Sequence, residues 1–325
     1  MRERACATAC ELFFADERVA LVLSEISLPL FEGPLRADPV RAVNVGIMEQ
    51  AMVGVAAGFA LEGFHPIVHT IAPFLVERPL EMLKLDFGYQ ELGATFVSVG
   101  ASYDYSVEGT THHAPADVAI VSTIPGFEAL VPGTGAEAER LLRATYANGR
   151  ATYLRTSARE NPRSFDVEPG RIEVVRRGGA DAAAATMIAV GPALGSALEA
   201  AQGIDLTLLY ATSVLPFDAE TVRREAGEHV IVVEPFLEGT LAPRIIEALA
   251  GRPVRLSSIG VPRTNLRGYG TPEDLDRVAG MDVAGIRGRI LAALPPLRHP
   301  GQGRVLRRRT STEDPLERRL AGVGG

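Results

Sequence analysis

Long apolar runs are absent from this chain of 325 residues. No stretch of about 18 apolar residues occurs, so a membrane-spanning helix is not expected. The segment after Arg2 and Arg4 contains Glu11 and Asp16 where a signal peptide would have an apolar core. We therefore expect a cytoplasmic protein that does not act at a membrane.

Cysteine and positive charge are also scarce. The two cysteines, Cys6 and Cys10, share one face of an expected first helix, and no second cluster stands at zinc-binding spacing. We therefore expect reduced core thiols and no metal site in this chain. Acidic side chains outnumber Lys and Arg by 40 to 33, which gives a net charge of −7. This balance argues against nucleic acid as a partner, because such binding depends on clustered positive charge.

Two phosphate-binding motifs are missing as well. The chain has no Walker A sequence and no convincing Gly-x-Gly-x-x-Gly after an expected strand. We therefore expect the phosphate groups of any large cofactor to be held elsewhere.

What is present is an alternation of short β-rich runs with longer helical patterns, which is typical of parallel α/β architecture. In the first half we expect strands at Val19–Leu23, Pro66–Thr70, Thr95–Val99 and Thr152–Leu154. We expect helices at 46–62, 73–92, 114–124 and 135–148, covering both faces of the sheet.

A second α/β domain follows the polar, linker-like stretch Ser157–Gly170. Its strands are expected at Thr186–Val190, Leu206–Tyr210, His229–Val233 and Val254–Ser258, and its helices at 193–202, 218–227 and 240–250. The sequence thus predicts two doubly wound α/β domains, at residues 1–160 and 172–295. Residues 296–325 are rich in Gly and Arg without apolar periodicity, so we expect a disordered tail.

Glu49 is a carboxylate near the start of a helix otherwise made of small and apolar residues. Burying a carboxylate is costly unless it is paired, protonated or used, and such acids collect at functional sites. Glu49 would serve equally well as a capping group for backbone amides near Gly46. The glycines and alanines that follow, between residues 51 and 58, would let another backbone approach closely, as at a sheet face or at an interface between subunits.

An apolar loop follows the strand that ends near Thr70. The carboxyl ends of strands are where open α/β sheets bind ligands, and Ile71 and Phe74 would offer a face to a flat ring. A phenylalanine in this position also commonly belongs to the core.

Adjacent histidines lie on the loop Glu108 to His113. Together with Gly109 and two threonines, His112 and His113 offer hydrogen-bond donors and a near-neutral acid–base group to an oxygen-rich substrate. The alternative is a solvated turn. Arg155 ends the strand Thr152–Leu154, where its guanidinium would bind a phosphate or carboxylate, or else form a surface ion pair.

Taken in this order, these motifs resemble the thiamine-diphosphate-dependent transketolases, in their pyrimidine-binding and C-terminal domains. Residues 41–63 resemble the family's helix with the cofactor glutamate, residues 70–86 its aromatic segment, and residues 109–113 its Gly-Pro-Thr-His signature, with Thr110 in place of proline. Leu215–Asp218, Val232–Glu234 and Gly270–Leu275 are similar to segments of the second domain.

The resemblance implies roles for the candidate residues. In this family the glutamate matched by Glu49 hydrogen-bonds a ring nitrogen of the aminopyrimidine of thiamine diphosphate, and the cofactor carries the difficult chemistry. Phe74 would stack on the pyrimidine with Ile71 beside it. His112, with His113 and Glu108 near it, would bind the sugar substrate and assist proton transfer, and Arg155 would meet a substrate phosphate. The implied reaction transfers a two-carbon ketol unit from a ketose to an aldehyde.

The Gly-Asp-Gly motif that holds magnesium and diphosphate in full-length transketolases is not found here. The resemblance therefore implies the C-terminal subunit of a split transketolase, active only with a diphosphate-binding partner subunit that supplies Gly-Asp-Gly and the Mg2+ ligands. Because the family's cofactor lies between subunits, it also implies self-association, with two copies of each chain in a heterotetramer.

Three departures suggest an altered substrate pocket: Gly100 where many relatives have histidine, Glu108 where Asp is usual, and Ile71 where an aromatic is common. The rival interpretations are the beta subunit of a 2-oxo acid dehydrogenase, a 1-deoxyxylulose-5-phosphate synthase-like enzyme, and a non-catalytic subunit of the same fold. The Thr111-His112 signature and Leu215–Asp218 favour transketolase over the dehydrogenase, and Glu49, Phe74 and His112 together argue against a non-catalytic subunit.

Overall fold

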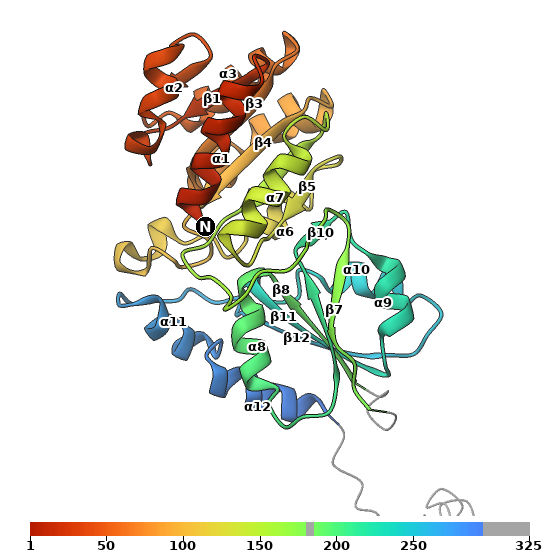
Figure 1. The fold of residues 1–325 in the computed structure, drawn as a ribbon. Coiled ribbons are helices and arrows are strands. Elements are labelled where there is room, and N and C mark those ends of the chain that lie inside the picture. Colours follow the sequence, from red (N-terminus) through yellow and green to blue (C-terminus); the bar gives the residue numbers. More distant parts are fainter. Residues whose placement is uncertain (180–184, 295–325) are drawn as a thin grey trace, which may run out of the picture. The chain divides into compact units, whose positions relative to one another are not determined.

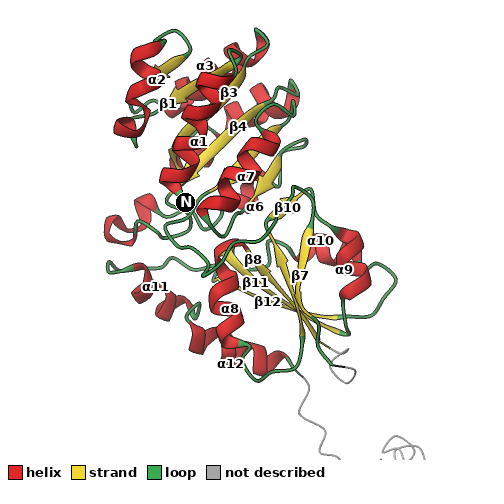
Figure 2. Ribbon diagram, viewed as in Figure 1, coloured by secondary structure: helices red, strands yellow, loops and turns green. Residues whose placement is uncertain are grey.

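A computed structural model describes residues 1–179 and 185–294 and contains two sheets with helices on their faces (Figure 1). The tail expected at 296–325 lies outside the described residues. Figure 2 shows the strands gathered into the two sheets and the helices around them.

The first sheet has seven strands in the order β10-β5-β6-β4-β3-β1-β2. They are β1 (Val19–Leu23), β2 (Ala42–Asn44), β3 (His65–Ile71), β4 (Ala94–Val99), β5 (Glu128–Leu130), β6 (Ala151–Arg155) and β10 (Ser213–Leu215). The helices of this region are α1 (Arg2–Ala15), η1 (Leu28–Phe31), α2 (Glu32–Ala37), α3 (Glu49–Leu61), α4 (Ala72–Val76), α5 (Leu80–Met82), η2 (Leu83–Tyr89), η3 (Ser106–His112), α6 (Asp117–Val121) and α7 (Gly135–Thr145).

Apolar residues explain why this sheet is covered on both sides. Strand β1 is buried at every position, as expected for a parallel strand with helices on both faces. On one face the apolar side chains of α1 and α7 form a core with β1, and on the other face α3 and η2 pack on β1, β3 and β4.

The second sheet has five strands in the order β12-β11-β8-β9-β7, with only the edge strand β7 antiparallel. Its strands are β7 (Ile172–Arg176), β8 (Ala185–Val190), β9 (Thr207–Ala211), β11 (His229–Leu237) and β12 (Arg255–Val261). Its helices are η5 (Gly191–Ala193), α8 (Leu194–Ala200), α9 (Ala219–Glu225), α10 (Ala242–Ala248), α11 (Pro272–Ala279) and α12 (Val283–Ala293). The expected α/β class with two parallel-dominated sheets is confirmed.

Several elements differ from the expectation. The single helix expected at 73–92 is broken into α4, α5 and η2, and Pro79, which lacks an N–H for a helix interior, lies at the break. Strand β10 comes from the second half of the chain yet pairs antiparallel with β5 of the first sheet. Strands β2, β5 and β10 were missed because each has only three residues, too few to show a period.

Because β1, β2, β3 and β4 are parallel, the loops that follow β2, β3 and β4 lie at the same end of the first sheet, where these strands have their carboxyl ends. Strands β2, β3 and β4 run in the same direction as β1, and their carboxyl ends lead to α3, α4 and η3 respectively. Ligands of open α/β sheets bind at the carboxyl ends of the strands. The fold therefore positions the Glu49 helix, the Phe74 segment and the histidine loop at the same end of the sheet.

Candidate functional site

Glu49 is the first residue of α3 and is only 2% exposed. A carboxylate at the start of a helix is stabilised by the backbone N–H groups and the helix dipole there. Its Oε2 accepts a hydrogen bond from Nη1 of Arg78 at 2.5 Å. Among the described residues, no side chain caps the start of α3 with a hydrogen bond. Glu49 therefore forms an ion pair with Arg78 and does not act as a capping group.

Arg78 connects Glu49 to the aromatic segment. Its guanidinium carbon lies 4.1 Å from the centre of the Phe74 ring, a cation–π contact. Arg78 was not among the candidate residues, although the helix expected at 73–92 would place it four residues after Phe74, the spacing that puts side chains on one face. In the structure Arg78 lies in the turn after α4.

His112 completes this group. Its ring meets the Phe74 ring edge to face, with 5.2 Å between centroids and 74° between planes. The hydroxyl of Thr111 lies 3.0 Å from Nδ1 of His112. The Tyr105 ring also meets the His112 ring edge to face, with centroids 6.3 Å apart. The structure thus connects Glu49, Phe74 and His112 in a row of contacts, from Glu49 to Arg78, from Arg78 to Phe74 and from Phe74 to His112.

Ile71, Glu108 and His113 surround this group differently. Ile71 is half-buried at the end of β3, and Glu108 is exposed on η3. His113 is buried against Tyr103, its Nε2 has no hydrogen-bond partner among the described residues, and burial lowers its pKa. His113 is therefore suited to a neutral state in the protein interior.

Arg155 is not brought together with Glu49. It is 1% exposed, and its Nε donates to Asp117 Oδ2 at 2.7 Å while Nη2 donates to Ser102 Oγ at 2.7 Å. It lines a cavity of about 60 Å³, which has room for a few water molecules but not for a sugar phosphate. Phosphate binding by Arg155 stays a prediction.

Gly100 explains one departure from the family pattern. Its φ is +77°, and a Cβ built there would lie 2.3 Å from the Tyr105 ring and 3.3 Å from Ile71. Tyr105 therefore occupies the space beside position 100 and packs on His112. A histidine at position 100 would collide with this ring.

The cofactor implied by the family can be tested against these residues. The Arg78 guanidinium is a flat, hydrogen-bond-donating group that rests on Phe74 while donating to Glu49. An aminopyrimidine is also flat, and it donates a hydrogen bond when a ring nitrogen carries a proton, so Glu49 and Phe74 fit it. Within residues 1–179 and 185–294, no cluster of three His, Cys, Asp or Glu side chains is placed to hold a metal ion.

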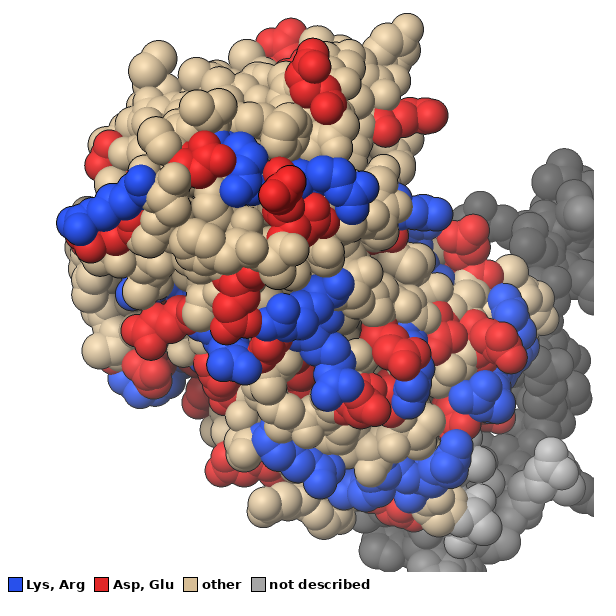
Figure 3. Space-filling model, turned by 45° about the horizontal axis from the view of Figure 1, so that its top comes forward, with Lys and Arg blue, Asp and Glu red and all other residues tan. Residues whose placement is uncertain are grey.

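The surface is consistent with the charge balance of the sequence. Acidic and basic side chains are interspersed on the face drawn in Figure 3. No helix within the described ranges is both long and apolar enough to cross a membrane.

Comparison with known proteins identifies the relatives of this chain. Residues 20–163 match the family described as transketolase, pyrimidine binding domain. The chain is 40% identical over 280 residues to an uncharacterised 33.6 kDa protein in the fasciation locus of Rhodococcoides fascians, covering 85% of this chain and 88% of the relative. It is 27% identical to a subunit of the apulose-4-phosphate transketolase of Phocaeicola vulgatus, covering 86% of this chain and 92% of that protein.

Longer enzymes and solved structures are also similar. A 1-deoxy-D-xylulose-5-phosphate synthase of Geobacter sulfurreducens is 31% identical, over 85% of this chain and 46% of that enzyme. A structure described as a split gene transketolase, inactive beta4 tetramer, has a TM-score of 0.77 at 24% identity and covers 90% of this chain and 97% of that one. At this identity the structural likeness establishes the fold.

Proposed function

Because this chain belongs to the transketolase family, we propose that it is the pyrimidine-binding, C-terminal subunit of a split thiamine-diphosphate-dependent transketolase. The observation that carries the proposal is the grouping of buried Glu49, the Phe74 ring and His112 at the carboxyl edge of the first sheet. The reaction is transfer of a two-carbon ketol unit from a ketose or ketose phosphate to an aldehyde.

Each candidate residue of this chain has its own role in the proposed reaction. Thiamine diphosphate, when bound, supplies the carbon nucleophile that breaks and forms carbon–carbon bonds. Glu49 would share a hydrogen bond with a ring nitrogen of the aminopyrimidine and favour the tautomer in which that nitrogen carries the proton. Phe74, with Ile71 beside it, would provide the face on which the ring rests. His112 lies at the edge of Phe74, where it can bind a substrate oxygen and move a proton.

The residues around His112 support an acceptor other than the usual pentose phosphates. Tyr105 packs on His112 and fills the space beside Gly100. Position 100 is the one at which many members of the family have a histidine. Glu108 is exposed beside them and would contact a sugar hydroxyl. We propose that Tyr105 and Glu108, with His113 behind the loop, shape the pocket for a sugar or sugar-phosphate substrate.

A second kind of chain completes the proposed enzyme. Two relatives are each named as one subunit of an apulose-4-phosphate transketolase, and this chain covers 92% and 84% of their lengths. The partner would bind the diphosphate and Mg2+ through Gly-Asp-Gly. The complex would hold two copies of each chain, because the cofactor of this family lies between subunits.

The test is ketol transfer with the partner present. The gene beside this one that encodes Gly-Asp-Gly supplies the partner, and the mixture should cleave ketoses only when both chains and thiamine diphosphate are present. Glu49→Gln should lower kcat by at least about 10²-fold, as expected for loss of a proton-transfer group. Glu62→Gln, an exposed acid at the other end of α3, is the matched control and should change nothing.

Several outcomes would contradict this proposal. Strong ketol transfer by this chain alone would end the split-subunit interpretation. Carbon dioxide release from pyruvate without ketose cleavage would favour a dehydrogenase or a deoxyxylulose-phosphate synthase. Unchanged hydrogen exchange at the thiazolium carbon in Glu49→Gln would remove Glu49 from the mechanism.

A further inference from the structure

Arg78 lies where the proposed cofactor ring would bind. The guanidinium donates to the Glu49 carboxylate at 2.5 Å and lies over Phe74, 4.1 Å from the ring centre. An aminopyrimidine bound to the same carboxylate and stacked on the same ring would need this position. The guanidinium and the pyrimidine therefore compete for one acceptor and one aromatic face.

We propose that Arg78 is a displaceable occupant of the pyrimidine position, which pairs with Glu49 in the cofactor-free chain and withdraws when thiamine diphosphate binds. This inference rests on the proposed function. The ligand that displaces it is a flat, hydrogen-bond-donating heterocycle.

The two members of the ion pair differ in their freedom to move. Glu49 is 2% exposed and fixed in the first turn of α3, whereas the Arg78 side chain is 36% exposed. Arg78 also lies outside regular structure, between the end of α4 at Val76 and the start of α5 at Leu80. The long arginine side chain can therefore rotate toward solvent while the carboxylate stays in place.

The pairing of Arg78 with Glu49 would stabilise the subunit while no cofactor is bound. A buried carboxylate whose partner is removed is strongly destabilising, because its charge is left without compensation. Arg78 supplies that compensation until the cofactor arrives. The same contact weakens cofactor binding, because only the fraction of molecules with Arg78 displaced can accept the ring.

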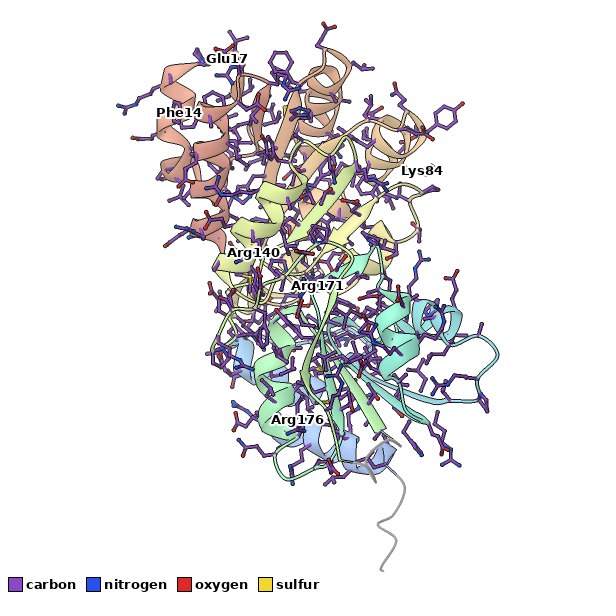
Figure 4. All side chains as sticks on the ribbon, turned by 45° about the vertical axis from the view of Figure 1, so that its right-hand side comes forward. Phe14, Glu17, Lys84, Arg140, Arg171 and Arg176 are labelled. Atoms are coloured by element: carbon purple, nitrogen blue, oxygen red, sulfur yellow. The ribbon has the colours of Figure 1, made fainter. Side chains whose placement is uncertain are left out.

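The experiment compares four single variants, and the double variant Arg78→Met/Glu49→Gln, with the wild-type chain. Arg78→Met removes the charge but keeps an apolar side chain over Phe74, and Arg78→Ala removes both. Lys84→Ala removes a positive charge from an exposed position six residues further along, on η2, where Figure 4 shows the side chain at the surface. Glu49→Gln removes the acceptor's charge.

Two quantities are measured that do not depend on turnover. The first is the dissociation constant of thiamine diphosphate, with excess Mg2+, for the complex of each variant with the diphosphate-binding partner, by isothermal titration calorimetry. The second is the urea midpoint of the chain alone. Arg78→Met and Arg78→Ala should bind the cofactor about five- to tenfold more tightly and unfold at lower urea. Lys84→Ala should change neither.

The outcomes separate this inference from the proposed function. Equal or weaker cofactor binding by both Arg78 variants, with Glu49→Gln still weakening it, would overturn the displacement of Arg78 and leave the transketolase assignment intact. A further requirement is that Arg78→Met tightens cofactor binding less in the Glu49→Gln background than in the wild-type background, since Arg78 and Glu49 are coupled by their ion pair. Failure of the wild-type complex to bind thiamine diphosphate would overturn the proposed function itself.

Discussion

At the scale of single residues, burial decides which groups of this chain are available for chemistry. Glu49 and Arg155 are both nearly inaccessible, yet their partners differ. The partner of Glu49 is a part-exposed arginine beside an aromatic ring, whereas Arg155 is bound to the fully buried Asp117. Arg78 can therefore turn toward solvent, whereas both members of the Arg155–Asp117 pair are buried.

A second buried titratable residue affects stability instead. His69 on β3 is 1% exposed, and its Nδ1 lies 2.8 Å from the carbonyl oxygen of Val97. Burial is the main cause that lowers its pKa from 6.5 to about 4. His69 is therefore neutral in the folded chain near pH 7.

This lowered pKa predicts acid sensitivity. The unfolded chain binds the proton with the ordinary pKa of 6.5, so folding stability should fall as the pH drops from about 6.5 toward 4. The loss should reach about 3 kcal/mol of unfolding free energy over this interval. His69→Gln keeps a side chain able to bond Val97 but does not titrate. Urea unfolding at several pH values should show a flatter profile for His69→Gln, and identical profiles would refute this origin of the acid sensitivity.

At the scale of elements, the turn after β4 illustrates how one position constrains the site. Gly100 follows β4 directly, with positive φ and the Tyr105 ring against it. Tyr105 in turn packs on His112. The conformation of this turn therefore fixes one wall of the site.

Gly100→Ala should be markedly destabilising. The left-handed backbone costs a side chain about 1 kcal/mol, and displacing the Tyr105 ring should add about 1–3 kcal/mol. Gly126→Ala is the matched control, because Gly126 has φ +82° but nothing within 4 Å of a built Cβ. Gly126→Ala should show only the backbone cost. If denaturant unfolding shows the same loss of unfolding free energy for Gly100→Ala and Gly126→Ala, the Tyr105 ring moves aside without measurable cost.

At the scale of the whole molecule, one face of α3 has no partner within the described part of this chain. Ala51, Gly54, Val55 and Gly58 are exposed at helical spacing, and Cβ atoms built at Gly54 and Gly58 would meet nothing within 4 Å. This small-residue face begins close to Glu49 in the first turns of the helix. It is suited to close packing against another copy or a partner chain, as the proposed assembly requires.

Gly54→Leu should reduce assembly without harming the fold of the chain. The added side chain has space within the monomer and improves helix propensity, but it would separate two closely packed helices. Gly288→Leu on α12 is the matched control, since it is also a helical glycine with nothing within 4 Å. Sedimentation equilibrium should show a smaller mass for Gly54→Leu alone. An unchanged mass would exclude this face from the contact between subunits.

Much of this molecule is visible in the sequence because it depends on local patterns. The buried strands near Val19, Pro66, Thr95 and Thr186 appear as apolar runs, since parallel strands are covered on both faces. Glu49 stands out because an acid in a small, apolar helix requires an explanation. The short strands β2, β5 and β10 could not be foreseen, because pairing with distant neighbours is what makes them strands.

Hydrophobic period and residue chemistry are local, so they were enough to predict an α/β class with mainly parallel strands and to single out Glu49, Phe74 and His112 as candidates. The order of the strands and the contacts between the candidates came from the folded structure. It joined Glu49 to Phe74 through Arg78, and it placed Arg155 in an ion pair with Asp117. These contacts connect residues 29 and 38 positions apart in the chain, and folding of the sheet, not sequence proximity, brings them within hydrogen-bonding distance.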